Sequence, residues 1–172
     1  GKHLAFMAHF SHYNELNTTA VLQAIENIRK TGAEIRTQSP LLRRINDRSE
    51  TWVKMWTRQV ELGLIPYYMF LERDTGPKDF FSIPVVKAID IYANTINNVS
   101  GLARTARGPV MSVLSGKVCL DGIANINGTK VIVARYLQAR DIKLVNHPFF
   151  IKYDENMKWF SEFTPAYGKS FF

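Results

Sequence analysis

The chain has 172 residues, about the length of one domain, and its 46% hydrophobic and 12% aromatic content excludes wholesale disorder. A formal net charge of +7 suits anionic partners such as phosphate-bearing cofactors, nucleic acid or acidic substrates. The single cysteine, Cys119, excludes an intramolecular disulfide and an all-cysteine metal or iron-sulfur site within this chain. With no signal-peptide pattern and no apolar run of about 18 residues, we expect a cytoplasmic protein without a membrane partner. Because the chain begins without Met, we also expect it to be part of something larger.

The first predicted unit is a strand followed by a helix. Residues 4–8 form a short apolar run typical of a buried strand. Asn17 or Thr18 can then cap a helix whose apolar residues recur at helical spacing from Val21 to Ile28. Gly32 stands where such a helix usually ends.

The same order repeats twice in the next 65 residues, as the spacing of apolar positions indicates. Residues 34–38 and 64–72 are predicted strands, the helix between them spans residues 49–62, and a loop over residues 73–83 leads to a helix that starts at Pro84. Three β-then-α units at a spacing of roughly 30 residues imply parallel strands in an α/β fold, because parallel neighbours need a crossover connection.

After Ser100 the helical period disappears. Branched runs alternate with turn signals at Ser115-Gly116 and Asn127-Gly128, which predicts β-hairpins. The aromatic-rich tail is predicted to be irregular and to cover the domain, since so many exposed Phe side chains would be unfavourable. We therefore divide the chain into regions 1–100, 101–140 and 141–172.

Polar residues gather after each of the three predicted strands. Because the carboxyl ends of parallel strands meet at one edge of a sheet, we expect a ligand site there. The residues concerned are His9, His12, Gln38, Arg43, Glu72, Arg73 and Asp74.

The spacing of His9, His12 and Glu15 resembles a metal motif but does not favour one. On a helix these three groups would align, whereas here the preceding strand and Asn14 indicate a loop. His12 and Asn14 are expected to hydrogen-bond within that loop, while His9, at the end of the strand, can point into the site. We predict no metal ligands in this chain.

Two further features leave alternatives open. Arg104 and Arg107 stand among glycines in "SGLARTARGP", a composition that suits anion binding as well as a solvated loop. Lys117 follows Gly116 in a turn, which predicts an exposed hairpin lysine, although a lysine there can also bind an aldehyde cofactor covalently if the turn reaches the site.

Several stretches together resemble the lysine 2,3-aminomutase family of radical S-adenosylmethionine enzymes. They are "HFSHYNEL", "GAEIRTQSPLLRRIND", "PYYMF", "PVVKAI", "VSGLA" and "GKV", in the order and approximate spacing of the family, over about residues 4–136. The resemblance implies that residues 1–100 are the C-terminal half of a (β/α) barrel. It also implies that residues 101–140 form a hairpin region associated with pyridoxal phosphate.

The resemblance further implies cofactors and site residues. Family members combine pyridoxal phosphate on a lysine with S-adenosylmethionine and a 4Fe-4S cluster held by a C-x-x-x-C-x-x-C motif, and they move an amino group between adjacent carbons of an amino acid. Lys117 corresponds to the pyridoxal lysine, His9 and Gln38 to residues at the adenosyl site, and Tyr67 and Phe70 to the lining of the cofactor cavity.

The departures from the family are informative. The cysteine motif is absent, so the cluster ligands and the N-terminal half of the barrel are expected outside this chain, which alone should be inactive. The glycine run before Lys117 is shortened to "LSGK". Lysine-specific members carry an aspartate where this chain has Arg73, followed by Asp74. With Arg104 and Arg107, these residues are predicted to bind an acidic or neutral amino-acid substrate.

Two other functions compete with this interpretation. Basic charge and the strand aromatics Tyr67 and Tyr68 could form a nucleic-acid or anion-binding surface, although the Lys and Arg residues form no dense stripe. A degenerate half-barrel could also serve only as a scaffold. In either case the edge of the first strand, residues 4–8, is predicted to pair with another copy of the chain.

Overall fold

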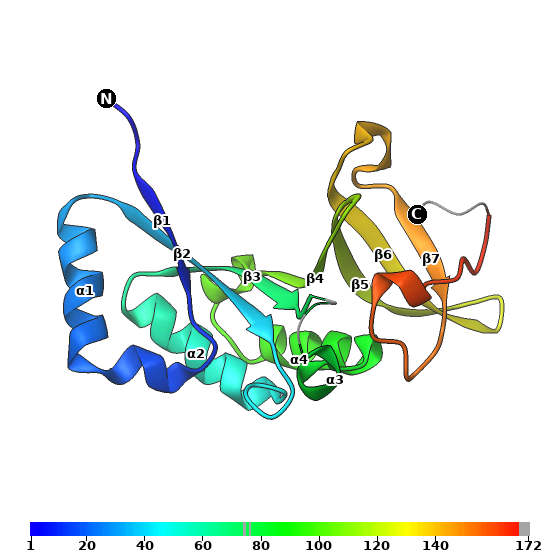
Figure 1. Ribbon diagram of the computed structural model, residues 1–172, viewed down its shortest axis with the longest axis horizontal. Helices are drawn as coiled ribbons and strands as arrows, with labels where there is room; N and C mark the ends of the chain where they lie inside the picture. Colours follow the sequence, from blue (N-terminus) through cyan, green and yellow to red (C-terminus); the bar gives the residue numbers. More distant parts are fainter. Residues whose placement is uncertain (74, 76, 169–172) are drawn as a thin grey trace.

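Seven strands form one mixed sheet in the computed structural model, which describes residues 1–73, 75 and 77–168 (Figure 1). The strands lie in the sheet in chain order: β1 (Ala5–His9), β2 (Glu34–Leu41), β3 (Ile65–Leu71), β4 (Arg107–Val113), β5 (Gly116–Ile126), β6 (Thr129–Ala139) and β7 (Pro148–Lys152). Neighbours from β1 to β4 are parallel, and neighbours from β4 to β7 are antiparallel. The predicted α/β fold is confirmed, and its sheet is mixed and has seven strands within the described chain.

The helices connect the parallel strands and lie on one side of them (Figure 1). They are α1 (Thr19–Lys30), α2 (Ser49–Glu61), α3 (Lys78–Phe81) and α4 (Val85–Asn97), with 3-10 turns at Tyr13–Asn17, Ala103–Thr105, Ile142–Leu144 and Phe160–Glu162. Thr18 caps α1, since its Oγ1 accepts a hydrogen bond from the Val21 N–H at 3.3 Å. Gly32 follows α1 at a φ of +78°, a conformation that favours glycine. No helix in the described part of the chain is long and apolar enough to cross a membrane.

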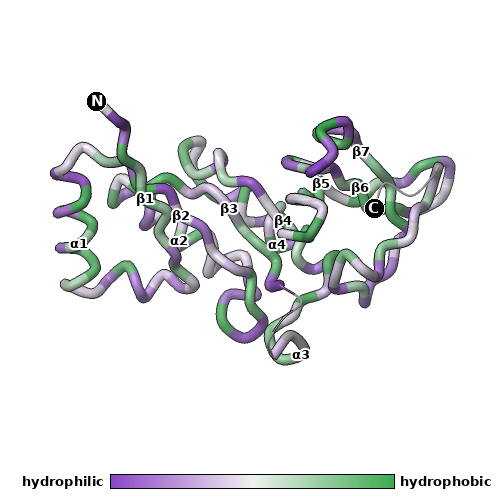
Figure 2. Tube along the Cα trace, turned by 45° about the horizontal axis from the view of Figure 1, so that its top comes forward, coloured by the Kyte–Doolittle hydropathy of each residue, from purple (hydrophilic) through white to green (hydrophobic). Residues whose placement is uncertain are grey.

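The main core fills the space between these helices and the sheet. Figure 2 shows α1 alternating between hydrophilic and hydrophobic residues, as expected for a helix with one buried face. In α2, Trp52, Met55 and Trp56 are fully buried against sheet residues such as Met69. One buried polar pair joins the two layers, because the Thr37 hydroxyl of β2 donates to Gln59 Oε1 of α2 at 2.7 Å.

Two strands extend beyond the sequence prediction. β2 continues to Leu41 and includes Pro40, which lies past the last residue of β2 that pairs with β1. A proline is tolerated there because no β1 acceptor needs its missing N–H. β4 begins at Arg107, where a loop was predicted, because Arg107 pairs with Tyr68 of β3. This strand pairs in parallel on one side and antiparallel on the other.

The C-terminal hairpins follow the turn signals. Asn127 and Gly128 connect β5 to β6 with φ values of +50° and +79°, as a two-residue hairpin turn requires. The tail does cover the domain, since Met157 and Phe163 are buried and the Met157 carbonyl accepts from the Val85 N–H at 2.7 Å. The prediction that the tail is irregular was wrong for β7, which pairs with β6.

The face of the sheet that points away from the helices carries a second, smaller apolar cluster. Tyr68, Val110 and Cys119 are its buried members, and Tyr67, Phe70 and Leu137 pack against them. The strands that build the cluster run from β3 to β6, so it crosses the junction between the parallel and antiparallel parts of the sheet. We call this side the open face.

Candidate functional site

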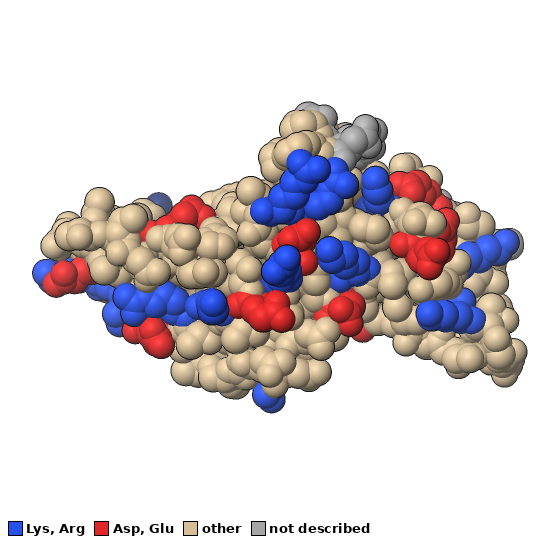
Figure 3. Space-filling model, turned by 90° about the horizontal axis from the view of Figure 1, so that it is seen from below, with Lys and Arg blue, Asp and Glu red and all other residues tan. Residues whose placement is uncertain are grey.

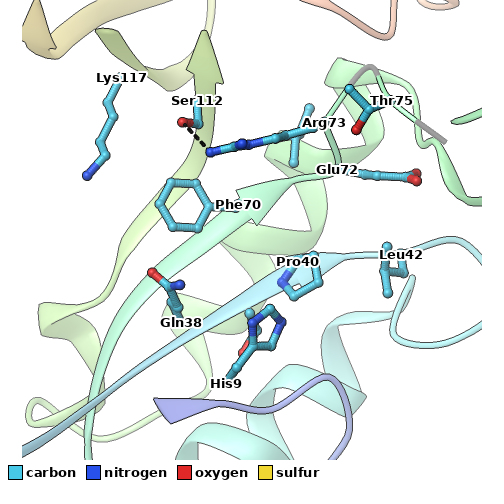
Figure 4. A pocket seen from close by; sticks show the side chains of 12 residues that line it. His9, Gln38, Pro40, Leu42, Phe70, Glu72, Arg73, Thr75, Ser112 and Lys117 are labelled. Carbon is cyan, nitrogen blue, oxygen red and sulfur yellow. Dashed lines mark hydrogen bonds between the residues drawn. The ribbon is translucent and has the colours of Figure 1, made fainter. Parts of the chain in front are cut away.

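A pocket of about 550 Å³ lies at the carboxyl ends of the parallel strands (Figure 4). Six of the residues predicted from sequence line it, and they come from or closely follow four different strands: His9, Gln38, Phe70, Glu72, Arg73 and Lys117. In Figure 4 Phe70 lies between Lys117 and Gln38. The convergence expected from the strand ends is therefore present in the fold.

The sheet register explains why these side chains meet. His9 of β1 is opposite Gln38 of β2, and Gln38 is opposite Tyr68 of β3. One step along, Ser112 of β4 is opposite Lys117 of β5. Residues that face each other in a sheet point to the same side, so these positions share the open face.

A β-bulge places two tyrosines on this face. Thr37 pairs with Pro66 and Gln38 pairs with Tyr68, so Tyr67 is the extra residue of β3. The ring centroids of Tyr67 and Tyr68 are 4.3 Å apart, and Tyr67 packs against the open-face cluster. Tyr67 was predicted to line the cofactor cavity, but the structure places it beside the pocket and not among its lining residues.

Lys117 is the second residue of β5 and reaches the pocket from the antiparallel side. Its Nζ lies 5.1 Å from the centroid of the Tyr68 ring. No hydrogen bond or ion pair of the Lys117 amine is found within the described chain. The amine is therefore held by an aromatic face and keeps its hydrogen-bonding capacity.

A glutamate and an arginine directly follow β3 and line the pocket. Arg73 donates from Nη2 to the Ser112 hydroxyl at 3.5 Å. Glu72 Oε2 is buried without a hydrogen-bond partner among the residues that the structure describes, and burial raises the pKa of this carboxyl. Asp74, predicted beside Arg73 as a substrate-binding residue, lies outside the described residues.

The sequence placed Glu72 at the ligand side of the sheet without giving it a chemical role, and it gave no indication of Ser112. Glu72 was grouped there because it directly follows an apolar strand whose end was expected to face the ligand, and it does line the pocket. Ser112 had no such signal, because its place in the pocket depends on β4 pairing with both β3 and β5.

The two arginines predicted for the substrate are not in this pocket. Arg107 is the first residue of β4, whereas the pocket lies near the end of that strand at Ser112. Arg104 precedes β4, and its Nε donates to the Val99 carbonyl at 3.1 Å. Both arginines line a separate pocket at the amino end of β4.

His12 and Glu15 serve their own loop, as expected for His12. Glu15 Oε1 accepts from the Ser11 and His12 N–H groups, both at 2.7 Å, and His12 Nδ1 accepts from the Asn14 N–H at 3.2 Å. These bonds form a capping box for the turn after β1. His9 alone of this motif lines the pocket.

Comparison with known proteins relates this pocket to a family. A protein of Aquifex aeolicus (strain VF5) with the name "Putative L-lysine 2,3-aminomutase" is 34% identical over 164 residues, which cover 95% of this chain and 42% of that protein. The chain is related to the lysine 2,3-aminomutase family. "L-lysine 2,3-aminomutase" of Escherichia coli (strain K12) is 29% identical over 93 residues, or 54% of this chain and 27% of that protein. No family model matches the chain.

The aminomutase-related chain spans less than half the length of both of these relatives. The alignment with the Aquifex protein nevertheless covers nearly all of the chain, including the part after residue 141 that sequence motifs alone did not match. The tail that covers the core is thus within the region of similarity.

One face of the described chain carries charges of both signs (Figure 3). Figure 3 shows Lys and Arg side chains interspersed with Asp and Glu side chains over one face of the aminomutase-related chain. A nucleic-acid surface usually carries a dense patch or stripe of positive charge. The charges on this face are mixed instead.

Proposed function

We propose that the chain is the C-terminal half of a radical S-adenosylmethionine aminomutase that depends on pyridoxal phosphate and moves an amino group between adjacent carbons of an amino acid. The observation that carries this proposal is the presence of Lys117, His9 and Gln38 in one pocket. The family resemblance implies these residues for the pyridoxal and adenosyl sites, and they come from strands that are far apart in sequence. The similarity to proteins named as lysine 2,3-aminomutases supports the same reaction class.

The residues of the pocket fit pyridoxal phosphate. Lys117 presents an amine without an ionic partner among the described residues, and Phe70 offers an aromatic face for a planar ring. Arg73 and Ser112 supply donors for an anionic group. When bound, this cofactor supplies an electron-accepting ring for chemistry at an amino-acid nitrogen and its neighbouring carbons.

Each pocket residue then has a distinct task. Lys117 would hold the cofactor covalently, and Phe70 would pack against its ring. Arg73, which donates to Ser112, remains able to bind a carboxylate with its other N–H groups. Glu72 can hold a proton near the ligand, because burial raises the pKa of its carboxyl.

An iron-sulfur cluster does not fit this chain. Cys119 is its only cysteine, lies buried on the open face, and has a pKa that burial raises to about 12. A thiol of this kind is a poor metal ligand at neutral pH. We therefore propose that the cluster ligands and the remaining strands of a (β/α) barrel belong to another part of the protein, and that this chain alone is inactive.

The proposed substrate is an acidic or neutral amino acid. Arg73 stands where lysine-specific members carry an aspartate, and its guanidinium would repel the ammonium of a lysine side chain while attracting a carboxylate. A full-length protein that converts lysine faster than glutamate would contradict this assignment.

Borohydride trapping tests the cofactor site directly. The folded chain is incubated with pyridoxal phosphate, its absorbance is recorded, and the adduct is reduced and mapped by peptide mass spectrometry. Modification is expected at Lys117 and absent in Lys117→Ala. Lys130→Ala is a matched control, since Lys130 also lies over a tyrosine ring, at 3.8 Å from the Tyr153 centroid, but lines no part of the pocket.

The alternatives predict other results. Labelling spread equally over exposed lysines, or unchanged in Lys117→Ala, would mean that Lys117 is only a turn residue. If the full-length protein also fails to label at Lys117, a scaffold without the cofactor becomes the better description.

A further inference from the structure

A second pocket of about 480 Å³ lies at the other end of β4 from the candidate site. Arginines from three elements line it: Arg104 from the turn before β4, Arg107 from the start of β4, and Arg135 from β6. Asp121 is the one acidic residue among its described lining. Three positive charges against one negative charge leave an excess of two.

The sheet brings two of these arginines to either side of one buried side chain. The thiol of Cys119 donates to the Gly108 carbonyl at 3.9 Å, next to Arg107 in sequence. On its other side, Cys119 of β5 pairs with Arg135 of β6. Arg107 and Arg135 therefore flank Cys119 on the open face, although 28 positions separate them in the chain.

The guanidinium groups of Arg107 and Arg135 both have hydrogen-bond partners within the protein. Arg135 Nε donates to Asp121 Oδ2 at 2.9 Å, and its Nη1 donates to Asn146 Oδ1 at 3.0 Å. Arg107 Nη1 donates to the Tyr68 hydroxyl at 3.3 Å, and this bond raises the pKa of the guanidinium. Since a guanidinium carries five N–H donors, most donors of these arginines remain available for a ligand.

Part of the pocket lining is tightly packed against the core. The Tyr92 hydroxyl donates to the Ala106 carbonyl at 2.7 Å, and burial raises the pKa of this phenol to about 12, so it stays neutral. A Cβ at Gly108 would lie 2.8 Å from the Met69 Cβ, so the backbone there packs directly on the core. Backbone packed in this way needs little rearrangement when the adjoining arginines bind an anion.

We propose that this pocket binds a small phosphate group, either inorganic phosphate or a phosphate monoester. The charge of a phosphate near neutral pH matches the excess of two positive charges. The planar fork of one arginine can pair with two oxygens of a phosphate or of a carboxylate, but only a phosphate has further oxygens left for a second arginine of the same pocket. The pocket is separate from the aminomutase site proposed above.

The test is a titration of the ¹⁵N-labelled chain with sodium phosphate at constant ionic strength. Saturable shifts at millimolar phosphate are expected in the Nε–H signals of Arg104, Arg107 and Arg135. Acetate, which carries one charge, should bind at least tenfold more weakly. Shifts that scatter over surface lysines, or equal binding of acetate, would overturn the proposal.

A matched pair of variants separates the pocket from the general charge of the open face. Arg107→Gln should weaken phosphate binding about tenfold or more, since hydrogen bonds between charged groups are lost. Arg36→Gln removes the same charge from an arginine that also stacks on Tyr67 but does not line the pocket. Equal weakening in both variants would overturn the site. Thermal unfolding verifies that each variant is folded.

One further measurement identifies which phosphate compound the pocket prefers. Another separates this proposal from the proposed cofactor site at Lys117. Glycerol 3-phosphate binding more tightly than inorganic phosphate identifies a monoester site, and the reverse order identifies a site for inorganic phosphate. Lys117→Ala should leave the phosphate titration unchanged. A failure of pyridoxal labelling at Lys117 therefore leaves this inference untouched, and a failure of phosphate binding leaves the cofactor site untouched.

Discussion

The amine of Lys117 lies 5.1 Å from the centroid of the Tyr68 ring, and the hydroxyl of the same tyrosine accepts a hydrogen bond from Arg107 at 3.3 Å. One ring thus contacts a cation from each of the two pockets. Burial raises the pKa of the Tyr68 phenol, so it remains neutral at physiological pH. Tyr68 is a positioning residue for Lys117, because an ammonium is attracted to the face of an aromatic ring.

Tyr68 variants test this role. Tyr68→Phe keeps the ring and should leave pyridoxal phosphate labelling of Lys117 unchanged, whereas Tyr68→Leu removes the ring and should lower the labelled fraction about two- to fivefold, as expected for the loss of one cation–π contact. The measurement is the modified fraction of Lys117 by mass spectrometry, at a temperature where both variants are folded. Equal labelling in the two variants would show that the ring does not position the amine.

Much of the candidate site could be predicted from the sequence, but not which residues lie outside it. The positions after predicted strands could be grouped because parallel strands end together, and this brought His9, Gln38 and Arg73 into one pocket. Arg107 was misplaced because the start of β4 depends on pairing with β3, which no local pattern reveals. The bulge at Tyr67 is hidden for the same reason.

For the fold as well, elements set by local sequence could be predicted, whereas elements that depend on pairing with distant strands could not. Caps and turns are local: the sequence offered Asn17 or Thr18 as the cap of α1, of which Thr18 is the one used, and it identified the Asn127-Gly128 turn. Strand β7 has no clear alternation, and it forms because β6 offers a free edge. The short helix α3 has only four residues, too few for a helical period to be recognised.

The buried pair of Thr37 and Gln59 should contribute measurably to stability. Thr37→Val leaves Gln59 Oε1 without its partner in a fully buried position, which is expected to cost about 1–3 kcal/mol in the free energy of unfolding. The double variant Thr37→Val/Gln59→Leu should recover part of this loss, because no polar atom is then left unpaired. Urea denaturation of both variants measures the difference, and a double variant less stable than Thr37→Val would refute this account.

Glu72 should make stability depend on pH. Its pKa in the folded chain is raised above the usual 4.5, so the folded state holds the proton more tightly than the unfolded state. The stability it contributes is complete below pH 4.5 and falls as pH rises through the folded pKa. Glu72→Gln cannot lose a proton at this position. The free energy of unfolding of the variant, relative to that of the parent chain, should therefore be higher at pH 7 than at pH 4. Because the side chain is partly exposed, we expect a change of about 0.5 kcal/mol or less.

Urea denaturation of Glu72→Gln and of the parent chain at pH 4 and pH 7 tests this prediction. Glu155→Gln is the matched control, since this exposed glutamate loses the same charge without a buried oxygen. A relative stability of Glu72→Gln that falls from pH 4 to pH 7 would reverse the predicted sign.

The edge of β1 should mediate self-association. The opposite edge strand, β7, is covered by the tail, whose Thr164 carbonyl accepts from Lys152 N–H and whose Ala166 N–H donates to the Phe150 carbonyl, both at 2.8 Å. β1 has a neighbour on one side only within the described sheet, and Met7 on it is 48% exposed. Open apolar edges of this kind pair with other chains.

Sedimentation over a range of concentrations tests this association. Met7→Lys should weaken dimer formation about tenfold or more, since a charged side chain disfavours pairing at an edge. Leu114→Lys adds the same charge at a 90% exposed hairpin residue away from that edge and should have no effect. A parent chain that stays monomeric at high concentration would exclude the interaction.

Gly116 links the stability of the β4–β5 hairpin to the position of Lys117. Its φ is +152°, and a Cβ there would lie 2.0 Å from the Gln138 carbonyl oxygen, which belongs to the backbone of β6. Gly116→Ala must therefore shift the start of β5, with an expected loss of about 2 kcal/mol or more in the free energy of unfolding and a lower yield of pyridoxal labelling at Lys117. Gly101→Ala is the control, since its Cβ would meet no atom within 4 Å. We expect urea denaturation to separate the two variants clearly, because only a Cβ at Gly116 collides with backbone that cannot rotate away. Equal stabilities would mean that the hairpin adapts without moving the lysine.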